Sequence, residues 1–224
     1  MLLEQIIKSS QEELKDFLAL ELQKSGYAPQ CLPGFLYATG KIPVMLVAHL
    51  DKKLEERVRT INYSDDGNIL TSPQGIGGDD RAGVYMILQI IKELPCYVLF
   101  CEDVEKHGVG AILFSDSGIM PDVNYIIELD RRGSDDAVYY ECYNPYFVEF
   151  FSNFGFIETE GNFTDIAIVA PTLGIAAVNL STGFYDEHQV YERIDLSVVN
   201  NNINRVKEII KTKTERFDYL AFRD

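Results

Sequence analysis

The sequence predicts an α/β protein: a three-layer sandwich in which a mixed, mostly parallel sheet is flanked by helices. Apolar, β-prone runs alternate along the chain with segments of helical periodicity, the order of elements that produces a parallel sheet. In addition, several of the β runs end directly in a histidine or a carboxylate. Open α/β sheets carry their sites beyond the carboxyl ends of their strands, so these polar residues fit the same fold.

The first half of the chain predicts two helices and several strands. Residues 1–25 have apolar residues near helical spacing and end at Gly26, which predicts one amphipathic helix. Two β runs, "FLYATG" and "VMLVAH", are separated by a turn at Gly40 and Lys41. The segments "RVRTINYS" and "NILTS" flank "DDG", which is typical of a hairpin. A helix follows in "DDRAGVYMILQIIKEL", and then a short buried strand in "YVLF".

The second half continues the alternation. A helix is predicted in "HGVGAILFS", strands in "VNYIIELD", "AVYYECY" and "GIAAVNL", and a final amphipathic helix in "DLSVVNNNINRVKEIIKT". The sequence contains no internal repeat, low-complexity tract or linker. We therefore expect residues 1–224 to form a single domain.

Composition narrows the function classes. The chain is 46% hydrophobic and 25% charged, with a net charge of −15, which disfavours binding to nucleic acid or to an anionic membrane surface. No apolar run approaches the roughly 20 residues of a membrane helix. The N-terminal segment lacks the basic and apolar regions of a secretory signal, and Cys96 and Cys101 lie in or beside a buried strand. We expect a cytoplasmic protein with reduced cysteines.

Six polar residues stand at the ends of predicted core elements. Each has an ordinary structural explanation when taken singly: Asp79 fits a helix N-cap, Asp130 a turn, and His188 a surface loop. His49 and Asp51 are two positions apart, so both can point to the same side beyond a strand. Together, two histidines and three carboxylates form a ligand mix that suits a pair of divalent cations, zinc first, with manganese or cobalt as alternatives. These five residues are His49, Asp79, Glu105, Asp130 and His188.

Six segments that contain or adjoin these residues, taken in chain order, resemble motifs of the co-catalytic zinc exopeptidases. This is the superfamily of peptidase T, carboxypeptidase G and the glutamyl and leucyl aminopeptidases. The resemblance covers nearly the whole chain. The segments that carry it are "LVAHLD", "GGDDRAG", "FCEDVEKHGVGA", "IIELD", "FTDIAIVAPTLGIAAVNL" and "LSTGFYDEHQVYE".

The resemblance implies a role for each residue. Asp79 is the bridging carboxylate, which completes one metal site with His49 and Asp130. The second site consists of Asp79, Glu105 and His188. Asp51 is implied to orient the ring of His49, as carboxylates beside a ligand histidine do. A cis peptide bond between Asp79 and Asp80 is implied as well.

The glutamate-pair motif departs from the family pattern. That motif has a general base followed by a metal ligand. An ungapped comparison from either flank puts Val104 in the base position and Glu105 in the ligand position. A gapped comparison instead makes Glu102 the base and Asp103 the ligand. We favour the ungapped comparison because two independent flanks agree, although a valine cannot accept a proton.

Several functions follow from this comparison. The first is a two-metal exopeptidase, most simply an aminopeptidase acting on small peptides, with Glu102 or Asp103 standing in as base. An amidohydrolase for N-acyl amino acids is the close alternative. The other class of function is that of a non-catalytic relative that binds metal, peptide or a protein partner. The valine at position 104 favours this alternative.

Two further expectations concern substrate access and assembly. The intervals from Asp51 to Asp79 and from Asp130 to His188 hold no inserted lid or dimerisation domain, so we expect an open site in a monomer or weak oligomer. Arg131 and Arg132 can either bind a substrate carboxylate or pair with the nearby Asp135 and Asp136.

Overall fold

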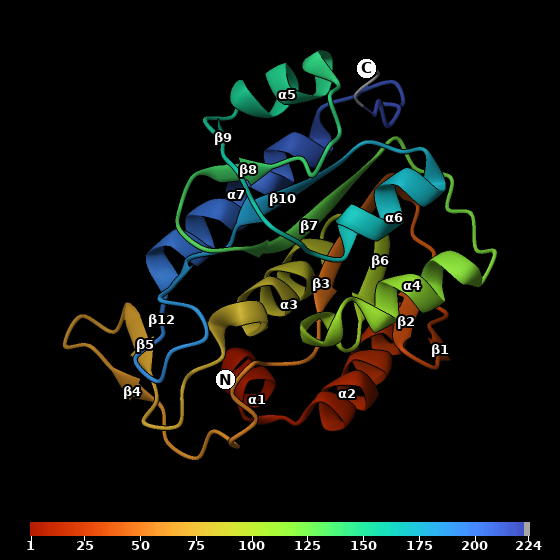
Figure 1. Cartoon of the computed structure of the whole chain (residues 1–224). Coiled ribbons are helices and arrows are strands. Elements are labelled where there is room, and N and C mark those ends of the chain that lie inside the picture. Colours follow the sequence, from red (N-terminus) through yellow and green to blue (C-terminus); the bar gives the residue numbers. More distant parts are fainter. Residues whose placement is uncertain (222–224) are drawn as a thin grey trace.

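The computed structural model describes residues 1–221, which form an eight-stranded sheet between two layers of helices (Figure 1). The strand order is β1-β2-β6-β3-β7-β10-β8-β9, and the four neighbours β6, β3, β7 and β10 run parallel. The prediction of a mixed, mostly parallel sheet is confirmed. The strands are β1 (Gln30–Leu32), β2 (Phe35–Ala38), β3 (Ile42–His49), β6 (Cys96–Cys101), β7 (Tyr125–Arg131), β8 (Asp136–Val138), β9 (Ile157–Glu158) and β10 (Ala177–Ser181).

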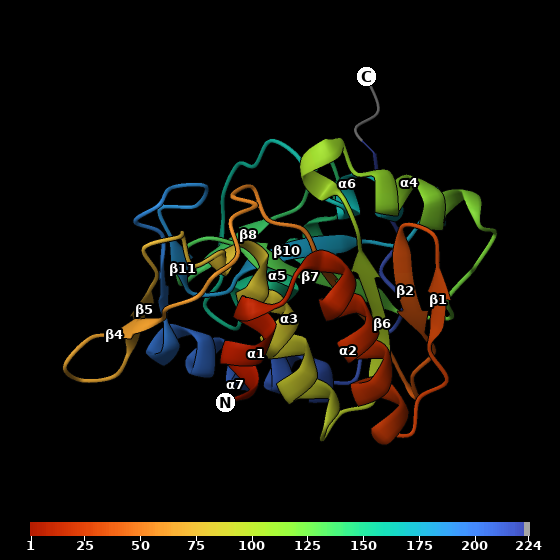
Figure 2. The same ribbon diagram turned by 90° about the horizontal axis from the view of Figure 1, so that it is seen from below.

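Strand alternation divides the core into two layers. Val44, Leu46 and Ala48 of β3 pack with the helices of one face, whereas Met45 and Val47 pack with those of the other. Figure 2 shows α4 and α6 on one side of the sheet and α1, α3 and α7 on the opposite side. This is the predicted three-layer sandwich. The helices are α1 (Leu2–Lys8), α2 (Gln11–Lys24), α3 (Gly78–Ile91), α4 (Val109–Asp116), α5 (Pro145–Ser152), α6 (Ile166–Leu173) and α7 (Leu196–Lys211).

A second, four-stranded sheet projects from the side of the molecule (Figure 1). Its order is β11-β12-β5-β4, and all its pairs are antiparallel. The predicted hairpin is present in it, with Tyr63 opposite Leu70. The sequence did not predict the other two strands of this sheet, β11 and β12, which come from residues 184–195. The four strands are β4 (Asn62–Tyr63), β5 (Ile69–Thr71), β11 (Phe184–Tyr185) and β12 (Arg193–Asp195).

The single N-terminal helix predicted for residues 1–25 is wrong, because two helices occupy this segment. The chain leaves helical conformation at Ser9, and Ser10 caps the second helix. Its hydroxyl accepts the backbone N–H of Glu13, whose carboxylate accepts the backbone N–H of Ser10. This capping box is a strong start signal that the apolar periodicity had concealed.

The predicted strand in "AVYYECY" is shorter than expected. β8 ends at Val138, and the backbone then takes positive φ angles at Tyr140 and Glu141. Two consecutive residues in the left-handed region cannot continue a strand, so the chain turns there. The helices α5 and α6 were missed, although Asn144 and Pro145 form a recognisable helix start.

The parallel strands bring their carboxyl ends to one edge of the sheet, where β3 ends at His49 and β7 at Arg131. The start of α3 lies against the same edge. A side chain at Gly83 would place its Cβ 1.7 Å from the carbonyl oxygen of Leu129, so only glycine allows this contact. Asp79 thereby lies beside the ends of β3 and β7. Within residues 1–221, no helix combines the length and the apolar character needed to cross a membrane.

Candidate metal centre

Asp51 ties together the ends of β3 and β6. One of its carboxylate oxygens lies 3.1 Å from Nδ1 of His49, and both residues are buried. The same carboxylate accepts the backbone N–H groups of Val104 and Glu105, each over 3.0 Å. These two residues form η1 (Val104–Lys106), a single 3₁₀ turn that follows β6. Asp51 therefore fixes the ring of His49 and also the position of Glu105.

Asp79 lies between the two histidines. Its Oδ1 is 2.8 Å from Nε2 of His49, and its Oδ2 is 3.0 Å from Nε2 of His188. Each histidine meets a second carboxylate: Asp130 is 3.3 Å from His49, and Glu105 is 2.7 Å from His188. The structure therefore gathers all five residues into two groups that share one carboxylate.

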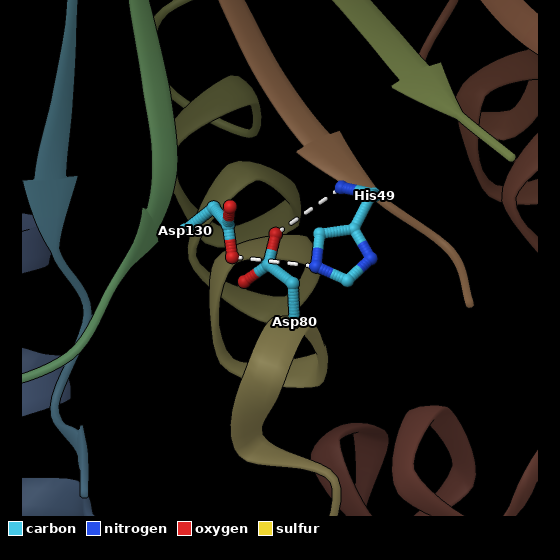
Figure 3. A group of neighbouring side chains, drawn as sticks. All are labelled: His49, Asp80 and Asp130. Atoms are coloured by element: carbon cyan, nitrogen blue, oxygen red, sulfur yellow. Dashed lines mark hydrogen bonds and ion pairs between the residues drawn. The ribbon is translucent and has the colours of Figure 1, made fainter. Parts of the chain in front are cut away.

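Asp130 is held in place by two uncharged neighbours. The Thr164 hydroxyl donates to Oδ2 of Asp130 over 2.8 Å, and the Asn179 side chain accepts the backbone N–H of Asp130 over 2.9 Å. Oδ1 of Asp130 faces the ring of His49 (Figure 3). One oxygen of Asp130 is thus kept for the histidine while the other is occupied.

Asp80 is a further carboxylate at this edge, which the sequence did not predict as a ligand. Figure 3 shows it between His49 and Asp130, and the three residues could hold a cation together. However, Asp80 already accepts the backbone N–H of His49 over 3.2 Å and that of Gly83 over 2.9 Å. The peptide bond between Asp79 and Asp80 is cis. Because both oxygens of Asp80 are engaged in backbone contacts, Asp79 is the better-placed ligand.

Glu192 supports the bridging carboxylate, and sequence reasoning missed it. It is 2% exposed and accepts the backbone N–H groups of Gly77 and Asp79 over 3.0 and 2.9 Å. Burial raises the pKa of its carboxyl to about 8. The signal in the sequence is slight, since Glu192 merely ends the "HQVYE" segment. It fixes the loop that presents Asp79.

Charge and burial shift the pKa values of this group. Hydrogen bonds to Asp79 and Glu105 raise the pKa of His188 to about 10. Burial opposes the charged form of His49, but Asp130, Asp51 and Asp79 together raise its pKa well above the usual range. Burial and the nearby Asp79 raise the pKa of Asp130 to about 6. The surrounding carboxylates therefore favour the protonated form of both histidines, which opposes cation binding at low pH.

This arrangement predicts how the metal-free protein responds to pH. The pKa of His188 is about 10 when folded and near 6.5 when unfolded, so its stabilisation is complete below about 6.5 and lost as pH rises through about 10. We expect His188→Gln to cost most stability near pH 6 and least near pH 10 in EDTA. Urea unfolding of both proteins across this range measures the difference. A difference that grows with pH would contradict the arrangement.

An open pocket of about 290 Å³ adjoins the five residues. His188, with a side chain 39% exposed, reaches its surface. Val104 is part of the pocket wall, whereas Glu102 and Asp103 are not. The residues that line it include His49, Asp79, Val104, Glu105, Asp130, Arg131, Arg132, Tyr140, Asn162, Phe163, Phe184, Glu187 and His188.

Glu102 and Asp103, the alternative base and ligand, face helix α2. Glu102 forms an ion pair with Lys15 over 2.7 Å. Asp103 accepts from Gln11 and pairs with Lys106, over 3.3 and 3.0 Å. The structure does not bring either carboxylate to the histidine groups. This geometry agrees with the ungapped comparison, in which Val104 and Glu105 face the site.

The two arginines at the end of β7, Arg131 and Arg132, line the pocket but are already paired. Arg131 donates from Nε to Asp136 over 3.1 Å and from an amino nitrogen to the carbonyl of Glu160. Arg132 pairs with Glu187 over 2.6 Å. The sequence left open whether the arginines bind a substrate carboxylate or pair with nearby aspartates. Arg131 pairs with Asp136, one of the two aspartates predicted as partners. The partner of Arg132 lies much farther along the chain.

The donor set fits divalent cations. Each group offers one imidazole nitrogen with two carboxylates, and the ligand atoms of Asp79, Glu105 and His188 lie within 4.8 Å of one another. In these trios, carboxylate oxygens face the histidine nitrogens at 2.7–3.3 Å. The shared Asp79 gives each group a negative charge, which offsets the charge of a cation. Imidazole and carboxylate ligands of this kind suit divalent cations such as zinc, manganese or cobalt.

Comparisons with known proteins support the fold. No protein-family model matches the chain, and no curated protein sequence matches it. A tripeptidase from Staphylococcus aureus is 15% identical, with a TM-score of 0.74 over 93% of this chain and 95% of that one. The aminopeptidase PepT from Bacillus cereus is 14% identical, with a TM-score of 0.72 over 94% and 95%.

A glutaminyl cyclase from Porphyromonas gingivalis has a similar structure too. It is 16% identical, with a TM-score of 0.63 over 92% of this chain and 94% of that one. The chain therefore has the fold of this tripeptidase and this aminopeptidase, and the predicted α/β fold is confirmed. Because peptidases and a cyclase share it, the fold alone does not decide the reaction.

Proposed function

We propose that this protein is a metal-dependent exopeptidase of aminopeptidase type, which hydrolyses small peptides at a site for two divalent cations. His49, Asp79 and Asp130 would hold one cation, and Asp79, Glu105 and His188 the other. The observation that carries the proposal is the position of Asp79, whose two oxygens face two different histidines at 2.8 and 3.0 Å. The structural similarity to a tripeptidase and an aminopeptidase supports it.

Each residue has a separate task in this proposal. When bound, the cations would polarise a scissile carbonyl and promote ionisation of water. Asp51 accepts from Nδ1 of His49, which leaves Nε2 free to bind a cation. Lys53 pairs with the second oxygen of Glu105 over 3.1 Å and so steadies the carboxylate nearest the surface. The pocket beside these groups is open enough to admit a peptide end.

Val104 favours a second candidate function, that of a binding protein without catalysis. This side chain is 9% exposed and belongs to the pocket wall, where the family resemblance puts a general base. A valine accepts no proton, and a general base contributes about 10²–10⁴-fold to hydrolysis. Such a protein would bind cations and peptides but release the peptides unchanged.

The experiment that tests the proposed function is an activity panel. The purified chain is loaded with zinc, manganese or cobalt and assayed against free dipeptides, tripeptides and aminoacyl amides, with matched N-acyl amino acids. Hydrolysis from a free amino end supports the aminopeptidase, and hydrolysis of only N-acyl substrates identifies an amidohydrolase. Peptide binding without turnover, with cations present, would favour the non-catalytic function.

Asp51→Asn tests the residue that connects β3 and η1. An asparagine keeps one acceptor oxygen but turns an amide N–H₂ toward a donor, so at least one of three contacts is lost. We expect cation affinity or turnover to fall about 10–100-fold, as for other partners of ligand histidines. Calorimetric titration with zinc measures the affinity, and circular dichroism verifies the fold. Unchanged affinity and turnover would remove Asp51 from the site.

We further propose that residues 1–224 form one domain without a lid and that the chain is a cytoplasmic monomer or weak oligomer. We likewise propose that it has no nucleic-acid or membrane partner. The open pocket supports the absence of a lid, and the net charge of −15 disfavours both kinds of partner. Light scattering of the purified chain tests the oligomeric state.

A further inference from the structure

A second, larger hollow lies beside the pocket of the metal centre. Its volume is about 750 Å³, within the range of ligand-binding sites. Tyr140, Asn162 and Phe163 line both spaces, so the two lie side by side. We call this second hollow the acidic groove, after the glutamates 141, 158 and 160 in its wall.

The acidic groove is built along the edge of the sheet, where β9 pairs with β8. Glu158 lies on β9 in register with Ala137. The chain leaves β8 through the turn at Tyr140 and Glu141, whose positive φ angles redirect the backbone. The groove therefore lies on one side of the metal centre and follows the last strands of the main sheet.

Carboxylates and aromatic rings make up the chemistry of the groove. Glu141, Glu158 and Glu160 are exposed, and none of the three forms an ion pair with any residue between 1 and 221. Several rings accompany them in the wall, and no lysine or arginine lines the groove. The nearest guanidinium, that of Arg131, is occupied by Asp136 and by the carbonyl of Glu160. The aromatic residues of the wall are Tyr139, Tyr140, Tyr143, Phe163 and Tyr219.

This combination selects for positive charge. Three carboxylates that form no ion pair attract an ammonium or guanidinium group, and the faces of tyrosine and phenylalanine rings do so as well. A peptide with acidic side chains would be repelled. An extended peptide whose scissile bond lies in the metal pocket can reach the groove, since the two hollows share three wall residues.

We propose that the acidic groove binds a lysine or arginine side chain of the peptide substrate, so that the enzyme prefers basic peptides. This inference rests on the proposed peptidase function for the position of the scissile bond. The binding preference itself requires only the groove.

The test compares tripeptides that differ at one position, which carries lysine, norleucine or glutamate in turn. The groove variant combines Glu141→Gln, Glu158→Gln and Glu160→Gln. Its control combines Glu12→Gln, Glu149→Gln and Glu215→Gln, which removes the same net charge from exposed glutamates outside the groove. Both kcat/KM and the affinities for fluorescent lysine and norleucine tripeptides are measured, the latter by anisotropy with zinc-loaded protein.

At one position the wild type should favour lysine over norleucine by about tenfold, as expected for a few exposed charge pairs. The preference should appear in KM, weaken at high salt, and disappear in the groove variant but not in the control. Equal use of the lysine and norleucine peptides, or an equal loss in both variants, would overturn the inference. If no peptide is hydrolysed but anisotropy shows the same preference, the proposed function fails and the groove assignment stands.

Discussion

Asp79→Asn is expected to leave the fold intact and to remove binding of two cations together with any peptidase activity. An asparagine has a single acceptor oxygen, so it cannot serve the two histidines that now face Oδ1 and Oδ2 of Asp79. It also removes the negative charge common to both groups. The fall in cation affinity should exceed the about 100-fold that loss of a supporting partner can cost. Calorimetric titration with zinc measures it.

Asp116→Asn provides the matched control, because Asp116 is an exposed aspartate of α4, away from the metal centre. This variant should bind zinc and act on peptides like the wild type. Thermal unfolding of all three proteins in EDTA separates a loss of ligands from a loss of fold. If Asp79→Asn binds two cations with wild-type affinity, Asp79 does not bridge them.

Val104→Glu is expected to increase peptidase activity by part of the about 10²–10⁴-fold that a general base contributes. The new carboxyl would stand in the pocket wall, adjacent to Glu105. Neighbouring carboxylates would raise its pKa toward neutrality, which suits a group that must accept a proton and then release it. Initial rates with free tripeptides at neutral pH measure the increase.

Val104→Gln is the control, because glutamine has the side-chain length of glutamate but cannot act as a base. This variant should show no increase in peptidase activity. One further variant tests the carboxylate of Glu102, which faces α2. Glu102→Gln should lower stability through the lost pair with Lys15 and leave the chemistry unchanged. If Glu102→Gln abolishes activity in an active wild type, or if Val104→Glu and Val104→Gln perform alike, our assignment of the base position is wrong.

The fold was predictable because its strongest signals are local and repeated. Strand runs such as "VMLVAH" are buried on both faces and alternate with amphipathic helices, which leaves little choice of fold class. Helix boundaries were predicted wrongly where a short polar capping signal competes with apolar periodicity, as at Ser10. The strands β11 and β12 of the small sheet were also missed, because they consist of only two and three residues and join the hairpin through the pairing of β12 with β5.

The five residues that we predict as ligands were selected by motif order and by the ends of strands, and the structure places them close together. Residues that support them were harder to predict. Glu192 acts on Asp79 from 113 positions away, and nothing in its neighbours indicates this contact. Asp80 is another case, since its two backbone contacts depend on how α3 meets β3. Such contacts arise from tertiary packing, which a single sequence does not encode locally.

The central claim is that Asp79 joins two cation sites in one centre. Elemental analysis of the wild-type chain, after loading with excess zinc and removal of the free metal, tests it most directly. If Asp79 bridges two cation sites, we expect about two zinc ions per wild-type chain, and at most one when Asp79 is replaced by asparagine. A wild-type chain that retains no zinc, manganese or cobalt after loading would contradict the account.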